Sequence, residues 1–176
     1  MPGMSKTTVG ILSGLGAAAI WGGMYVVSKV VLEVIPPFAL ITTRLLLGGL
    51  VLWLVLARRG GVQISGRQFW QVFGVGTLGY GISLGFQFIG TRLSTAANGS
   101  LVTSATPAFI LLFAAFVLGE KITSRRVLAL LVSTLGVLAV VDPRSARVAP
   151  ELFLGNLSLL AAALTWALYS VLVRLV

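Results

Sequence analysis

The sequence contains neither cysteine nor histidine, and only four of its 176 residues are acidic. The absence of cysteine excludes disulfide bonds and thiolate metal sites. The absence of histidine removes the commonest general base and metal ligand, which leaves hydrolase and metalloenzyme functions with little support. We therefore expect no metal, no cofactor and no enzymatic activity.

Positive charge is less scarce, because 13 lysines and arginines give the chain a net charge of +9. These cations cluster in the short connections between apolar runs and form no continuous basic stripe. That distribution is typical of membrane proteins that follow the positive-inside rule, and it argues against nucleic acid as a partner.

Long apolar runs make up most of the sequence. Of all its residues 57% are hydrophobic, and the mean hydropathy is +1.04. Because each crossing of a bilayer needs roughly 20 apolar residues, the chain has room for about six. We predict an all-α integral membrane protein whose partner is the lipid bilayer. The six predicted transmembrane helices span about 9–34, 37–57, 66–91, 95–119, 124–141 and 152–176.

Local signals support these boundaries. Pro37 suits the first turn of the second helix. Ser65 and Gln68 have the spacing of a capping box, and Ser94 or Thr95 can cap the fourth helix. Thr123 or Ser124 can cap the fifth. Residues 1–8 precede the first run, which at 9–34 is too long for the apolar part of a signal peptide.

The charges outside the predicted helices also indicate an orientation. One side carries more of them, so the N-terminus is predicted to be cytoplasmic and the protein to lie in the inner (plasma) membrane. Trp53 and Trp70 fall near the cytoplasmic ends of their helices, where indoles favour the interface. The cations of this side are Lys6, Arg58, Arg59, Arg67, Lys121, Arg125 and Arg126, against Arg92, Arg144 and Arg147 on the other.

An internal repeat links the first and sixth runs. The motif Gly-x-Leu-Ser recurs at Gly10 and Gly155, and at the same offset Trp21 corresponds to Trp166 and Lys29 to Arg174. Five helices separate the two starts, and because five is odd the second copy enters from the opposite side of the membrane. This predicts an inverted-topology repeat, the architecture of many secondary transporters.

Three stretches then resemble the EamA domain of the drug/metabolite transporter superfamily. They are Ala17–Gly22 leading to Lys29, Arg44 in the second helix, and the block from Ser94 to Val137 that contains Pro107 and Leu-Gly-Glu-Lys-Ile-Thr at 118–123. Together they cover almost the whole chain.

The resemblance implies ten helices in two inverted five-helix repeats, with a substrate path between them and export of small metabolites such as amino acids. On that basis residues 9–142 form the first repeat, 143–151 a linker and 152–176 the start of the second. Since the sequence stops in mid-run at Val176, we expect a longer parent chain; a short form that pairs with a second half or copy is the alternative.

Two cations inside predicted helices need an explanation. Lys29 and Arg44 both fall within about 7–11 Å of the outer boundary, where an intramembrane charge costs at least about 2.5–3.5 kcal/mol. A substrate carboxylate shared by the two would offset this. Alternatively, Lys29 snorkels or pairs with Glu33, and Arg44 bonds to backbone carbonyls.

Aromatic and polar residues near mid-membrane are the other candidates for substrate binding. Trp21, Tyr25 and Tyr80 lie away from the interfaces, and Trp166 and Tyr169 occupy related places in the sixth helix. They either line a cavity or pack with satisfied hydrogen bonds. The first half of the fourth helix is polar, with Asn98, Ser100 and Thr103, which either line the path or allow close helix packing, and Pro107 should kink the helix. Ser83 and Gln87 are further candidates on the third helix.

The glycine pattern at 74–79 fits a dinucleotide-binding motif, but it lies inside an apolar span without the necessary strand or acid. No acidic residue lies deep in a helix, so proton coupling through a membrane-embedded glutamate has no candidate.

The sequence therefore favours a secondary transporter that works by alternating access. There are two alternatives. One is a polytopic membrane enzyme, and the other is a non-transporting scaffold, for which we expect no cavity.

Overall fold

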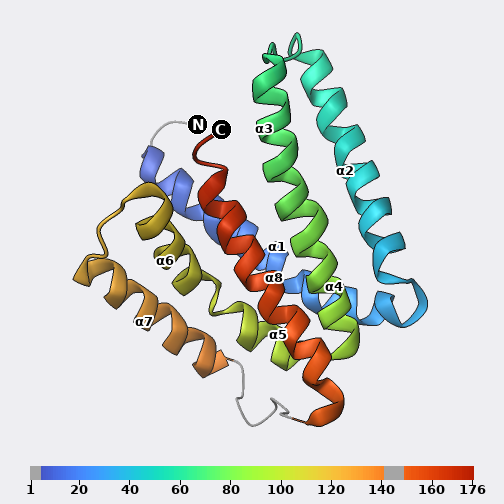
Figure 1. The fold of residues 1–176 in the computed structure, drawn as a ribbon, viewed down its shortest axis with the longest axis vertical. Helices are drawn as coiled ribbons and strands as arrows, with labels where there is room; N and C mark the ends of the chain where they lie inside the picture. The colour runs from blue at the N-terminus through green and yellow to red at the C-terminus, as the bar shows by residue number, and fades with distance from the viewer. Residues whose placement is uncertain (1–4, 141–148) are drawn as a thin grey trace.

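A computed structural model describes residues 5–140 and 149–176, and within these ranges all regular structure is helical. Figure 1 shows the helices in chain order. The elements are α1 (Lys6–Val34), α2 (Pro37–Arg58), α3 (Gly66–Gly76), η1 (Thr77–Ser83), α4 (Leu84–Leu93), α5 (Ala96–Thr103), α6 (Thr106–Leu118), α7 (Ser124–Val140), η3 (Pro150–Leu152) and α8 (Phe153–Leu172).

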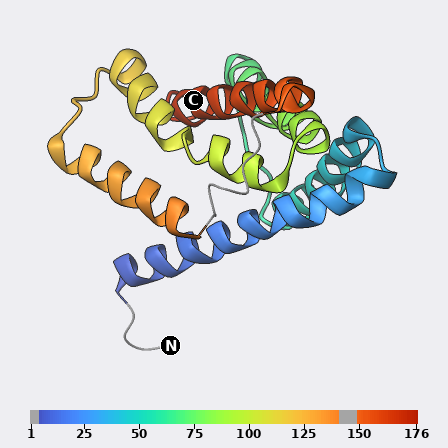
Figure 2. The same ribbon diagram turned by 90° about the horizontal axis from the view of Figure 1, so that it is seen from below.

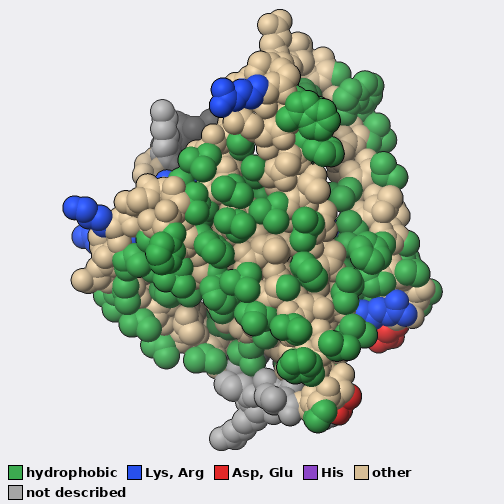
Figure 3. Space-filling model, viewed as in Figure 1, with side chains coloured by type: hydrophobic (Ala, Val, Ile, Leu, Met, Phe, Trp, Pro, Cys, Tyr) green, Lys and Arg blue, Asp and Glu red, His purple; other side chains and the backbone are tan. Residues whose placement is uncertain are grey.

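The prediction of an all-α, multi-span membrane protein is confirmed. Five helical segments in the described residues are long and apolar enough to cross a bilayer, and α7, at the place of the fifth predicted helix, has 17 described residues. Figure 3 shows hydrophobic side chains spread over a whole face, with lysine and arginine at its edges. The five segments are Thr7–Val34, Pro37–Arg58, Gly66–Leu93, Ala96–Leu118 and Pro150–Leu172.

The predicted helix starts follow from side-chain caps. Ser65 and Gln68 form the reciprocal capping box, and Thr95 accepts a hydrogen bond from the amide of Asn98 at the start of α5. Thr123 accepts one from the amide of Arg126 at the start of α7. The first helix begins three residues earlier than predicted, because Ser5 caps it.

The third and fourth predicted helices are each divided. A π-helical turn, η1, lies between α3 and α4. The fourth helix stops at Thr103 and resumes at Thr106, directly before Pro107. Proline has no N–H to continue the helical ladder, so the helix breaks where a kink was predicted.

The sixth predicted helix does not reach the end of the chain, since α8 ends at Leu172. Beyond it the backbone makes tighter turns, in which the amide of Arg174 donates to the carbonyl of Val171. There the Arg174 side chain pairs with Glu120, from the connection between α6 and α7. The prediction of a helix through Val176 was therefore wrong by four residues.

Helix α8 packs against η1, α4, α5 and α6. Its buried face consists of small and aliphatic residues, among them Leu159, Ala163, Ala167 and Val171. Gly155 permits a close approach of the two backbones, because a Cβ there would lie 2.6 Å from the backbone of Leu93. Figure 2 shows α1 and α7 at the periphery.

Helices α1 and α8 run in opposite directions: the first turn of α1 and the last turn of α8 lie on the same side of the molecule (Figure 1). This is the relative direction that an inverted repeat requires.

Candidate functional site

A cavity of about 240 Å³ lies where α1, α4, α6 and α8 converge on the break in the fourth span. Five residues that the sequence analysis selected line it: Trp21, Gln87, Thr103, Pro107 and Trp166. Its other lining residues are Thr106, Ala162 and Ala163. The cavity thus joins the start of the chain, the polar fourth span and the second copy of the internal repeat.

The break before Pro107 shapes one wall of this cavity. Thr103 directs its hydroxyl to the carbonyl of Gly99 at 2.6 Å, and Ser100 bonds to that of Ala96 at 3.0 Å. These hydroxyls satisfy carbonyls of their own helix, as serine and threonine in helices often do. Pro107 leaves the carbonyl of Thr103 without the usual donor four residues on.

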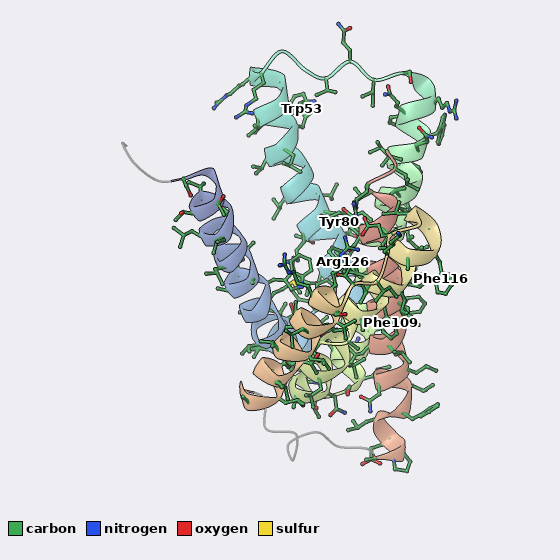
Figure 4. All side chains as sticks on the ribbon, turned by 90° about the vertical axis from the view of Figure 1, so that its left-hand side faces the viewer. Trp53, Tyr80, Phe109, Phe116 and Arg126 are labelled. Carbon is green, nitrogen blue, oxygen red and sulfur yellow. The ribbon has the colours of Figure 1, made fainter. Side chains whose placement is uncertain are left out.

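Four aromatic residues form a cluster beside the cavity. The Trp166 ring centroid lies 5.2 Å from that of Trp21, 5.7 Å from that of Tyr80 and 5.0 Å from that of Tyr169. Tyr80 and Tyr169 meet edge to face at 5.6 Å. The sequence placed all four near mid-membrane, and the structure brings them together from α1, η1 and α8. Figure 4 shows Tyr80 near the middle of the molecule along the length of its helices, whereas Trp53 lies toward the far end of α2.

The π-helical turn η1 places Tyr80 in this cluster. Within it, Gly79 contacts Tyr169 so closely that a Cβ would lie 2.5 Å from the ring. Single π-helical turns often occur at functional sites. The sequence did not predict η1, although its first glycine, Gly79, is the last glycine of the pattern at 74–79.

Gln87 supplies an unused hydrogen-bond donor. It is 5% exposed and lines the cavity, and its Nε2 has no partner among the described residues. A buried amide without a partner costs free energy, about 1–3 kcal/mol. An acceptor on a bound molecule would offset that cost.

Lys29 makes contacts that the sequence did not predict. Its ammonium donates to the carbonyls of Thr91, Arg92 and Ser94, at 3.0, 3.1 and 2.7 Å, at the end of α4. An ammonium has three N–H donors, so these contacts use all of them. A cation at a helix C-terminus is also favoured by the helix dipole. Lys29 thus fixes α1 to α4.

Arg44 lies apart from both Lys29 and the aromatic cavity. It is exposed, with its guanidinium carbon 5.4 Å from the centroid of the Phe88 ring, a cation–π contact. It lines a separate cavity of about 390 Å³ between α1 and α2. Lys29 lines another, with Glu33 and Arg92, so in this structure the two cations do not face a common space.

Two other selected residues hold α8 in place. Ser83 donates to the carbonyl of Ala162 at 2.9 Å. Asn98 donates to Asn156 Oδ1 at 2.9 Å, and Ser94 donates to the same oxygen at 2.6 Å. The side chain of Tyr25, the remaining selected residue, lies outside what the structure describes.

Sequence reasoning missed Asn156, Ala162 and Ala163 as contributors to this region. The signal was available, since Ala162 and Ala163 stand at the positions of Ala17 and Ala18 in the repeat. Small side chains one turn before Trp166 leave the space that forms the cavity.

Known proteins resemble this chain over most of its length. It is 31% identical over 174 residues to the aromatic amino acid exporter YddG of Ancylobacter novellus, covering 96% of this chain and 58% of that one. It is 26% identical over 179 residues to the uncharacterized transporter YoaV of Bacillus subtilis, covering 98% and 58%. The chain therefore spans somewhat more than half the length of these relatives.

A solved crystal structure has the same fold, with a TM-score of 0.64 and 28% identity, over 88% of this chain and 57% of that one. The family model of the EamA-like transporters matches residues 8–142. The chain belongs to the EamA-like transporter family.

Proposed function

We propose that this protein exports a small metabolite with a flat apolar or aromatic group and a carboxylate, such as an aromatic amino acid. The observation that carries the proposal is the cavity lined by Trp21 and Trp166, with the unpaired amide of Gln87 in its wall. Aromatic faces suit a flat apolar group. The amide N–H suits a carboxylate or carbonyl oxygen.

The similarity to an exporter named for aromatic amino acids supports the same substrate class. A cavity lined by polar and aromatic groups also favours a transporter over a scaffold that packs its mid-membrane residues fully. The lack of histidine and the scarcity of acidic residues favour it over a membrane enzyme.

The proposed mechanism is alternating access between inverted repeats, with residues 9–142 as the first repeat and 152–176 as the beginning of the second. The N-terminus faces the cytoplasm of the inner membrane in this proposal. Arg44, exposed beside its own cavity, is the cation in reach of an anionic group on an entering or leaving substrate. In this proposed mechanism Lys29 has a structural role.

Efflux from proteoliposomes tests the proposal. Vesicles containing the protein are loaded with radiolabelled phenylalanine, tryptophan, leucine or aspartate, and loss of label is compared with that from empty vesicles. We expect protein-dependent efflux that is fastest for the aromatic substrates. Equal efflux from empty and protein-containing vesicles across the panel would refute it.

A further inference from the structure

A second cavity, of about 360 Å³, lies between α6, α7 and the end of α8 and shares Pro107 with the first cavity. Helices α6 and α7 each line it with four residues of one face. From α6 these are Pro107, Ile110, Leu111 and Ala114, and from α7 Arg126, Ala129, Leu130 and Ser133. Seven residues of helix correspond to about 10 Å, so the apolar part extends that far into the membrane.

Charged groups close one end of this cavity. Glu120 binds Arg126 through one carboxylate oxygen and Arg174 through the other, each at 2.7 Å. The carboxylate is mostly covered, at 21% exposure, while the arginine side chains are 46% and 57% exposed. The arginines therefore keep donors open to the surroundings. Figure 4 labels Arg126 on the side that faces the viewer.

The cations around this end of the cavity outnumber the carboxylate that neutralises them. Lys121 and Arg125 are both exposed in the same region, so four cations accompany the single carboxylate of Glu120. This end of the bundle is the side that the charge distribution predicts to be cytoplasmic. Basic pockets between transmembrane helices at that side favour anionic lipid headgroups.

We propose that this cavity binds one anionic phospholipid. Its phosphate is held by Arg126 and Arg174, and an acyl chain lies against the apolar faces of α6 and α7. Charge complementarity selects an anionic headgroup, and the 10 Å apolar groove selects a lipid over a soluble phosphate. Through Arg174 the lipid bridges α7 and the end of α8, and so strengthens the contact of α8 with the first five helical spans.

Thermal unfolding in detergent tests the proposal with dioleoyl phosphatidylglycerol as the probe. Dioleoyl phosphatidylcholine supplies the same chains without net charge, and glycerol phosphate supplies the phosphate without chains. We expect only phosphatidylglycerol to raise the midpoint of the wild-type protein, and native mass spectrometry to detect one retained molecule. Equal effects of the two lipids, or an equal effect of glycerol phosphate, would overturn the proposal.

Variants locate the site. Replacing Arg126 and Arg174 together by glutamine should weaken phosphatidylglycerol binding by roughly fivefold for each arginine. Arg125→Gln, outside the cavity lining, is the matched control and should bind as wild type. Because the double variant leaves Glu120 unpaired and can fail to fold, Ala129→Phe is the second test. It fills the groove without touching the ion pairs, and undiminished lipid retention by it would overturn the proposal.

Discussion

Trp21 and Trp166 hold the same position in the two copies of the internal repeat, and their rings contact each other at 5.2 Å between centroids. A two-fold axis exchanges equivalent residues, so equivalent residues in contact must lie close to it. In the proposed inverted repeat, the axis therefore passes by this pair. The cavity beside the two rings then lies where inverted repeats of transporters place their substrates.

Replacing Trp166 by leucine should weaken transport of aromatic substrates more than that of aliphatic ones. Trp166 contacts three other aromatic rings, and a ring pair contributes about 0.5–1.5 kcal/mol beyond buried area. The KM for phenylalanine efflux should rise roughly two- to twelvefold. Trp53→Leu, at an exposed position of α2, is the control. Equal changes in the two variants would show that Trp166 has no specific role.

Gln87→Met should separate function from stability. The variant removes an amide that has no partner among the described residues, so the thermal midpoint should stay the same or rise. Efflux should fall roughly tenfold or more, because the amide's hydrogen bond to a charged substrate group is lost. Gln71→Met, on the exposed face of α3, should change neither quantity. A lower midpoint with normal efflux would assign Gln87 to packing.

Lys29→Met should lower the stability of the protein and leave its transport of substrate unchanged, the opposite of Gln87→Met. The variant leaves three backbone carbonyls at the end of α4 without their donor, and the free energy of unfolding should fall by roughly 1.5–3 kcal/mol. The KM of the protein that remains folded should be unchanged. Lys121→Met, at an exposed position, is the control. A raised KM with an unchanged thermal midpoint would restore Lys29 as a substrate ligand.

Acid should loosen the contact between the α6–α7 connection and the end of α8. The hydrogen bond from Arg174 is the largest influence on the pKa of Glu120 and lowers it from its ordinary value of 4.5. Burial opposes this effect, and the hydrogen bond from Arg126 lowers the pKa further, so that the net direction is downward. A carboxyl whose pKa is lowered by folding stabilises the fold above its unfolded pKa, and loses that effect as the pH falls through the folded value.

The thermal midpoint of the wild-type protein should therefore drop as the pH falls from about 5 to 3. Glu120→Gln removes the titrating group and should reduce this drop. Glu151→Gln, at an exposed position in η3, should leave it as in wild type. If Glu120→Gln retained the full pH dependence, another group would be responsible.

The sequence by itself determined the class of protein and most helix boundaries. Hydropathy over about 20 residues decides whether a segment crosses a bilayer, and caps such as Ser65 with Gln68 act over one turn. The interruption at Pro107 is equally local, since it follows from a missing N–H. Each of these causes is contained in a short stretch of chain.

Which polar groups face the cavity was decided only by the tertiary structure. Trp21, Gln87 and Trp166 line one space, whereas Ser83 and Asn98, equally polar and central in sequence, hold α8 in place. Lys29 finds its three acceptors more than sixty residues away. Such choices depend on how each helix is rotated and which helix it packs against. Those are properties of the assembled bundle, because only close packing of distant segments fixes them.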